Sequence, residues 1–257
     1  MIEKKSMLVT GATHGTGYAI AKKFATEGYD VFITSRDGEA AKAAARKLAE
    51  EVPGTAAFGY SLPVGGEQEI LDMFADIREK GYVVDTVVLN AANLGIAQDT
   101  LTVDIEKYKE VIYTNMIWNY MIARTAARGM KEKGGGAIVF INSNTAYRAI
   151  PARSAYSASK SGMLGLSRTL AMDLGQYNIR SNCVLPGMIK TDRWLNNFND
   201  CRNAPSNFTP LGDIAEFEDI ANAAYYLGSD MSRNTTGAEL TVDGGNMIQL
   251  YPIVPEK

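Results

Sequence analysis

Short apolar runs alternate with longer amphipathic stretches along most of the chain. The apolar runs span residues 6–9, 31–35, 56–62, 86–89, 137–143, 179–185 and 239–242, a length typical of buried strands. Helical spacing of apolar residues marks the stretches 39–51, 67–80, 105–133 and 216–229, and further helices are expected after residue 17 and from Ser154. This alternation predicts an α/β fold in which helices cover both faces of a parallel sheet.

Composition indicates one ordinary globular unit. The chain has 257 residues, of which 46% are hydrophobic and 21% charged, with no internal repeat or Pro/Ser-rich linker, so we expect a single domain over 1–257. A net charge of −3 argues against nucleic acid or an anionic membrane as the main partner. No apolar run is long enough to span a bilayer, and the start lacks the pattern of a signal peptide. Cys183 and Cys201 are the only cysteines, which fits a reducing cytoplasm.

The scarcity of histidine excludes several kinds of chemistry. His14 is the only histidine and no Cys-x-x-Cys pair exists. A multi-histidine metal centre is therefore nearly ruled out, and so is a histidine-based triad, because His14 lies inside the glycine loop, a poor place for a general base. We expect no metal site.

The first strand is followed by a glycine-rich loop, Thr10-Gly-Ala-Thr-His-Gly-Thr-Gly17. Glycines 11, 15 and 17 would let backbone N–H groups and the start of the next helix approach a pyrophosphate. A tight turn with positive φ would explain the glycines equally well, but the Gly-Lys-Ser/Thr of a P-loop is absent. A dinucleotide is the favoured ligand of this loop.

The end of the second strand indicates which dinucleotide binds. An acidic residue there would bond the adenosine ribose and repel a 2′-phosphate, but the sequence has Ser35 and Arg36. Arginine can hold a phosphate by charge-assisted hydrogen bonds, and His14 could add a donor. Asp37 follows and could instead turn inward. These residues favour NADP(H).

Candidate catalytic chemistry lies between residues 143 and 160. On a helix beginning at Ser154, Tyr156 and Lys160 lie one turn apart on the same face. A lysine ammonium favours the phenolate, which would make Tyr156 a proton donor and acceptor near neutral pH. Ser143, at the end of its strand, could bond the same substrate oxygen. Tyr-x-x-x-Lys alone is a weak signal, because Tyr18 and Lys22 match it too; thirteen residues before Tyr18 lies a lysine, which indicates ordinary helix surface.

Other polar and aromatic positions are open to two interpretations. Asn115 lies mid-helix among apolar neighbours, so it is either a structural link or part of a proton path. Small residues around Asn90 serve either close packing or close approach of a cofactor. The irregular segment 188–212 predicts a substrate lid, with Trp194, Leu195, Phe198 and Phe208 lining or covering the substrate. The apolar tail IQLYPIVP predicts a contact between subunits.

Taken together, the motifs TGATHGTG, LNAA, Asn115, Ser143, YSASK and PGMIKT make the chain resemble the short-chain dehydrogenase/reductase family over essentially its whole length. The resemblance implies a doubly wound Rossmann fold with a seven-stranded parallel sheet, assembled as a homotetramer. It implies Tyr156 as general acid/base, with Ser143 holding the substrate oxygen. Lys160 would lower the pKa of the tyrosine and bond the nicotinamide ribose, and Asn115 would anchor a water connecting Lys160 to solvent.

The resemblance also implies a set of cofactor-binding positions. These are Gly11, Thr13, His14, Gly15, Gly17, Ser35, Arg36, Asn90, Tyr156, Lys160, Pro186, Gly187, Ile189 and Thr191, of which Ile189 and Thr191 match positions that meet the nicotinamide carboxamide. One departure is Leu89-Asn90-Ala91-Ala92 where the family has Asn-Asn-Ala-Gly, which loses one amide and the glycine.

The expected reaction is reversible hydride transfer between the nicotinamide and a ketone or secondary alcohol, with NADP(H) as cofactor. An apolar lid suits a bulky, hydroxysteroid-type substrate better than a free sugar. A 3-oxoacyl thioester, a polyol or sugar, and a non-catalytic nucleotide-binding role are the alternatives.

Overall fold

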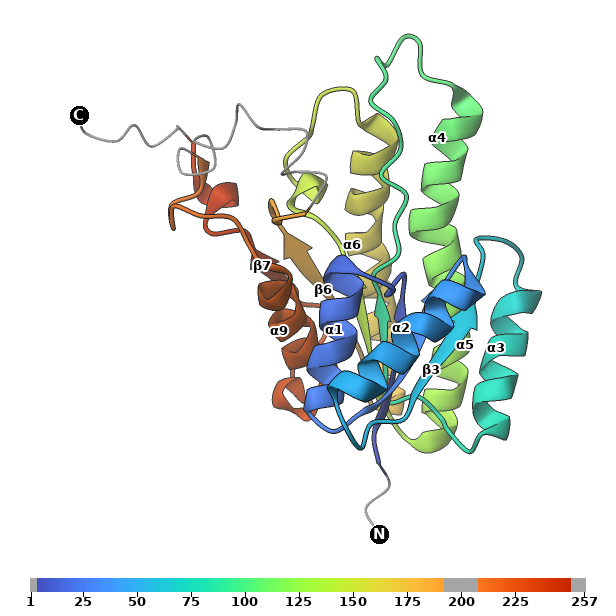
Figure 1. Ribbon diagram of the computed structural model, residues 1–257. Helices are drawn as coiled ribbons and strands as arrows, with labels where there is room; N and C mark the ends of the chain where they lie inside the picture. The colour runs from blue at the N-terminus through green and yellow to red at the C-terminus, as the bar shows by residue number, and fades with distance from the viewer. Residues whose placement is uncertain (1–3, 192–207, 251–257) are drawn as a thin grey trace.

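A computed structural model describes residues 4–191 and 208–250 of the chain. Its strands are β1 Ser6–Thr10, β2 Asp30–Ser35, β3 Ala57–Ser61, β4 Thr86–Leu89, β5 Gly136–Ile141, β6 Ile179–Pro186 and β7 Glu239–Val242. They form one sheet in the order β3-β2-β1-β4-β5-β6-β7, and every neighbouring pair is parallel. The predicted seven-stranded, doubly wound Rossmann fold is confirmed (Figure 1).

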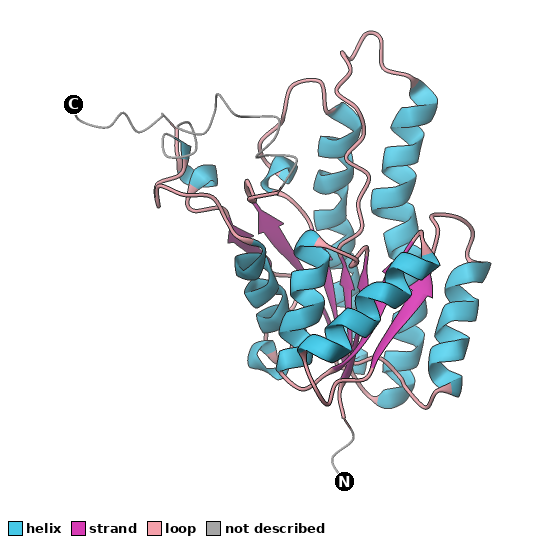
Figure 2. Ribbon diagram, in the orientation of Figure 1, coloured by secondary structure: helices cyan, strands magenta, loops and turns pink. Residues whose placement is uncertain are grey.

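Helices cover both faces of the sheet (Figure 2). They are α1 Gly15–Thr26, α2 Gly38–Glu51, α3 Gln68–Glu79, α4 Ile105–Ile112, α5 Asn119–Lys133, α6 Ser154–Leu174 and α9 Phe217–Gly228. One core cluster packs α1, α2 and α9 against the sheet, and a second cluster does the same for α3, α5 and α6. Because both faces are covered, the central strands β1 and β4 are buried at every position rather than at alternate ones.

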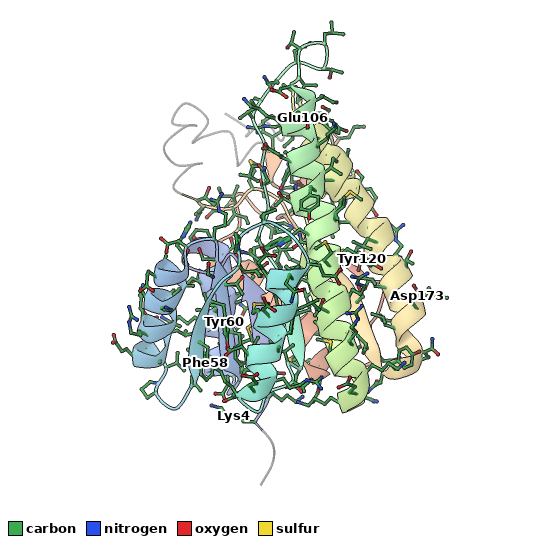
Figure 3. The ribbon with its side chains drawn as sticks, turned by 90° about the vertical axis from the view of Figure 1, so that its right-hand side faces the viewer. Lys4, Phe58, Tyr60, Glu106, Tyr120 and Asp173 are labelled. Atoms are coloured by element: carbon green, nitrogen blue, oxygen red, sulfur yellow. The ribbon has the colours of Figure 1, made fainter. Side chains whose placement is uncertain are left out.

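The stretch 105–133, predicted as one α-helix, contains a π-helical segment at Tyr113–Trp118 between α4 and α5. The three segments form one continuous column, on which Figure 3 labels Glu106 and Tyr120. Asn115 and Trp118 in the π segment are buried. A π turn places one extra residue in the helical turn and is frequent at functional sites.

One difference from the sequence prediction affects the site. β5 ends at Ile141, so Ser143 lies two residues beyond the strand rather than at its last position. The predicted lid residues Trp194, Leu195 and Phe198 lie outside the described residues, and Phe208 is 45% exposed. In the described ranges, no helix combines the length and apolar character needed to cross a membrane.

Candidate active site

The loops that follow β1, β4, β5 and β6 meet at the carboxyl edge of the sheet. The chain order reverses between the neighbouring strands β1 and β4, which is the topological switch point of the sheet. Open α/β sheets bind ligands in the crevice outside the carboxyl ends of the strands at this point. The glycine loop, Asn90, Ser143 and Pro186 all lie at this edge.

The glycine loop is held against the end of β4. The Asn90 side-chain amide donates to the carbonyls of Thr10 and Gly11, at 3.0 Å each. In return, the hydroxyl of Thr10 accepts from the backbone N–H groups of Asn90 and Ala91. Asn90, predicted as a cofactor-binding residue, is therefore placed as the anchor of the loop.

Gly17 shows how closely the loop is packed. A Cβ there would lie 2.4 Å from the Gly11 carbonyl oxygen and 2.7 Å from the Asn90 amide nitrogen. Gly11 and Gly15 have φ of +63° and +56°, which favour glycine. α1 begins at Gly15 with no acidic residue in its first turn, so its positive end is unneutralised. This cradle fits the pyrophosphate of a dinucleotide.

The residues after β2 have separate roles. The Asp37 carboxylate caps α2 by accepting from the N–H groups of Glu39 and Ala40, at 2.9 and 3.1 Å. The sequence left open whether the Asp37 side chain turns inward. In the structure this side chain caps the amino end of α2 instead. Arg36 is exposed and Ser35 is half-buried. In the glycine loop, the Thr13 hydroxyl and His14 Nδ1 are 3.0 Å apart.

Lys160 is the buried cation of the site. Its side chain is 2% exposed, and its Nζ donates to the Ile141 carbonyl at 2.9 Å. The same Nζ lies 5.6 Å from the centre of the Tyr156 ring, as the one-turn spacing predicts. Burial lowers the pKa of Lys160 to about 8, so the ammonium predominates at neutral pH.

A buried amide connects the serine to the lysine helix. The Asn142 side chain accepts from the Ser143 N–H at 2.9 Å and donates to the Lys160 carbonyl at 3.1 Å. Ser143 itself caps a short turn, because its hydroxyl accepts from the Thr145 N–H at 3.2 Å. Sequence reasoning missed Asn142; a polar residue ending an apolar run just before the candidate serine was the available signal.

Asn115 links the loop after β4 to α6. Its side-chain oxygen accepts from the Asn93 N–H at 2.8 Å, and its amide donates to the Asn93 carbonyl and the Ser159 hydroxyl, at 3.0 and 2.9 Å. The Ser159 hydroxyl donates in turn to the Tyr156 carbonyl at 2.7 Å. The structural link is thus present, while the water-anchoring role of Asn115 stays a prediction.

The segment after β6 approaches the loop that follows Ser143. A Cβ on Gly187 would lie 2.6 Å from the Cβ of Asp243 and 3.4 Å from the Asn144 amide nitrogen. Ile189 pairs with Ala215 in an isolated parallel bridge. The Thr191 N–H donates to the Ile189 carbonyl at 2.7 Å. Pro186 through Thr191 therefore run along the same edge as Ser143.

The second Tyr-x-x-x-Lys pair is arranged differently. Lys22 pairs with Glu51 at 2.8 Å, and burial together with the charge of Glu51 raises the pKa of Tyr18 to about 12. The ion pair of Lys22 and the raised pKa of Tyr18 agree with the interpretation of these two residues as ordinary helix surface. Among residues 4–191 and 208–250, no group of three His, Cys, Asp or Glu side chains is arranged to hold a metal ion.

Burying Lys160 should reduce the stability of the coenzyme-free protein. Its pKa of about 8, against the ordinary 10.5, means that the unfolded chain binds more protons between these pH values, so stability rises with pH in that window. We expect Lys160→Met to stabilise the protein at pH 7 by about 2 kcal/mol, after allowance for the lost hydrogen bond. Urea unfolding at pH 7 and pH 10 checks this prediction, because the difference in free energy of unfolding between the variant and the wild type should be smaller at pH 10. A variant less stable than the wild type at pH 7 would contradict it.

Comparison with known proteins identifies the family. The family model described as enoyl-(acyl carrier protein) reductase matches residues 11–246. The chain belongs to the short-chain dehydrogenase/reductase family. It is an oxidoreductase of secondary alcohol or keto groups from a family that uses nicotinamide cofactors.

Relatives with different substrates are about equally similar. The 3-oxoacyl-[acyl-carrier-protein] reductase of Chlamydia trachomatis is 34% identical over 247 residues, covering 95% of this chain and 98% of the relative. The L-rhamnose 1-dehydrogenase (NAD(P)(+)) of Azotobacter vinelandii is 37% identical over 254 residues, covering 96% of this chain and 98% of the relative. A solved structure of 7α-hydroxysteroid dehydrogenase with NADH and 7-oxo glycochenodeoxycholic acid is 30% identical, with a TM-score of 0.85, covering 94% of this chain and 93% of that one.

Proposed function

We propose that this protein is an NADP(H)-dependent oxidoreductase that interconverts a bulky, hydroxysteroid-type ketone and its secondary alcohol. The observation that carries the proposal is the buried Lys160 ammonium one helical turn from Tyr156, with Ser143 connected to the same helix through Asn142. Burying a cation beside a phenol costs free energy, and ionisable groups perturbed in this way cluster at functional sites.

When bound, the coenzyme supplies or accepts the hydride. The residues of this chain handle the proton and the charge. Tyr156 gives its proton to the alkoxide that develops on the substrate oxygen, and the Ser143 hydroxyl donates a hydrogen bond to that oxygen. Lys160 favours the phenolate that remains, because the opposite charge is close. Pro186 to Thr191 and the glycine loop hold and orient the dinucleotide.

Arg36 should set the preference for NADP(H). With Asp37 engaged in capping α2, the exposed Arg36 guanidinium is the charge available to a 2′-phosphate at the end of β2. We expect Arg36→Ala to weaken NADPH binding by about 10- to 100-fold and to leave NADH affinity unchanged. Fluorescence titration with both coenzymes measures this. Arg46→Ala, which removes an exposed arginine from α2, is the matched control, and equal weakening of NADPH and NADH would defeat the assignment.

The proposed substrate class rests on apolar side chains near Tyr156. Leu94 and Ile96 are 43% and 51% exposed and line the same crevice as Tyr156. A coupled NADPH assay over a 3-oxosteroid, a 3-oxoacyl thioester and a keto sugar tests the proposal. The highest kcat/KM should belong to the steroid. A preference for the thioester or the sugar would assign the substrate to that class instead of the steroids. Binding of NADPH without turnover of any of the three would favour a non-catalytic role.

We also propose that residues 1–257 form one domain and that the protein is a cytoplasmic homotetramer. Ile248 and Leu250, two residues apart, are 87% and 81% exposed, and a contact between subunits would remove their apolar surface from water. Sedimentation equilibrium tests the assembly, and a monomer would overturn it.

A further inference from the structure

The segment that follows β4 is hydrogen-bonded to the rest of the molecule at its beginning and around Gly95. At its beginning, Asn93 exchanges two hydrogen bonds with the buried Asn115 side chain, at 2.8 and 3.0 Å. Further along, the Arg153 guanidinium donates through Nη1 to the carbonyls of Leu94 and Gly95, at 3.0 and 2.8 Å. In Figure 1 this segment runs between α4 and α6 toward the amino ends of both helices.

Arg153 is placed where it can influence the tyrosine helix. It immediately precedes α6 and lies three residues before Tyr156. Its neighbour Ala152 has φ of +58°, a left-handed conformation unusual for a residue other than glycine, and the Ala152 carbonyl accepts from the Gln98 N–H at 3.0 Å. In the part of the chain that the structure describes, no carboxylate pairs with Arg153, so its charge is directed at the two carbonyls.

The fastened segment packs closely beside Tyr156. Leu94, Ile96 and Val103 line a crevice together with Tyr156 and Arg153. The crevice holds only about 20 Å³, room for a single water molecule. The apolar side chains on this segment are consequently fixed next to the tyrosine, and Leu94 and Ile96 still have exposed surface that a ligand can cover.

We propose that Arg153 is a positioning residue that holds Leu94 and Ile96 as an apolar wall beside Tyr156. This wall gives the site its preference for ketones with bulky apolar substituents. The inference rests on the proposed reductase function and adds a determinant of specificity to it. Without the two carbonyl contacts, the segment between Asn93 and Gln98 is held only at its two ends, so the wall loosens and its contact with a large substrate weakens.

Arg153→Ala and Arg153→Lys test this inference with two ketones and NADPH. The ketones are a 3-oxosteroid and cyclohexanone, which has a comparable reacting ring but no further apolar bulk. In Arg153→Ala, kcat/KM for the steroid should fall about tenfold through a higher KM, because the carbonyls of Leu94 and Gly95 lose their charged donor. Activity with cyclohexanone and the Kd for NADPH should not change. Arg153→Lys, which keeps a charged donor, should restore part of the steroid KM.

Arg78→Ala is the control, because it removes an exposed arginine paired with Glu132 at 2.7 Å, away from the candidate site. Unchanged steroid KM in Arg153→Ala would overturn the inference, as would equal losses with both ketones or a parallel loss of NADPH affinity. If the alanine variant does not fold, the lysine variant decides by the same ratio of the two ketones. A wild type that reduces neither ketone would overturn the proposed function itself. An active Arg153→Ala variant that keeps the wild-type preference for the steroid would overturn only this inference.

Discussion

Replacing Tyr156 by phenylalanine should lower kcat for ketone reduction by about 10²- to 10⁴-fold, the usual contribution of a general acid. In the proposed mechanism the hydroxyl is the proton source for the alkoxide, whereas the ring, which lies 5.6 Å from the Lys160 ammonium, is retained in the variant. NADPH affinity should therefore stay close to that of the wild type. Steady-state kinetics together with coenzyme titration measure both quantities.

Tyr18→Phe is the matched control for this experiment. It removes the hydroxyl from the other Tyr-x-x-x-Lys pair, where Lys22 is engaged with Glu51 and the pKa of the phenol is raised to about 12. Its turnover should equal that of the wild type. Near-normal turnover by the Tyr156 variant, or a comparable loss in the Tyr18 variant, would reject the assigned role of Tyr156.

Gly17→Ala should have the second largest effect, by closing the nucleotide cradle. The added Cβ would meet the Gly11 carbonyl oxygen at 2.4 Å and the Cα of Ala12 at 2.8 Å, and both are backbone atoms that cannot rotate away. We expect NADPH affinity to fall at least about 100-fold and the free energy of unfolding to fall by about 1–3 kcal/mol. Coenzyme titration and urea unfolding measure the two effects.

Gly175→Ala provides the comparison for the glycine substitution. Gly175 is exposed, has a φ of −57°, and an added Cβ there would meet nothing within 4 Å. This variant should bind NADPH normally and be at least as stable as the wild type, since alanine suits a helical backbone better than glycine. If the Gly17→Ala variant binds NADPH as tightly as the wild type, the loop does not cradle the coenzyme.

Much of the fold was predictable because burial on both sides of a parallel sheet leaves a strong signal in the sequence. The strands β4 and β7 were predicted with their observed bounds, and the other strands within two residues. Apolar runs such as Met7–Val9 must be strands, since they are too short for buried helices and are followed by turn residues. The π segment at Tyr113–Trp118 was not predictable, because one added residue in a turn hardly alters the pattern of apolar positions.

The site was predictable where its residues are neighbours in sequence. Tyr156 and Lys160 are one turn apart on a single helix, so their proximity follows from helical geometry alone. Contacts between distant segments leave no comparable signal. The bridge from Ser143 to Lys160 through Asn142 and the contact of Arg153 with the loop after β4 depend on how the elements pack. Asp37 is a different case, because its contacts are local: its carboxylate accepts from Glu39 and Ala40, so an N-cap before the helix expected from residue 39 was within reach of the sequence.

Transfer of deuterium from NADPH tests the central claim most directly. The protein would be incubated with the best ketone of the assay and with NADPH that carries deuterium at both C4 positions, and the alcohol would be analysed by mass spectrometry and NMR. The proposed chemistry predicts one deuterium on the carbinol carbon, with formation of this product abolished or slowed at least about 100-fold in Tyr156→Phe. An alcohol without deuterium, or labelled alcohol formed equally fast by the phenylalanine variant, would contradict it.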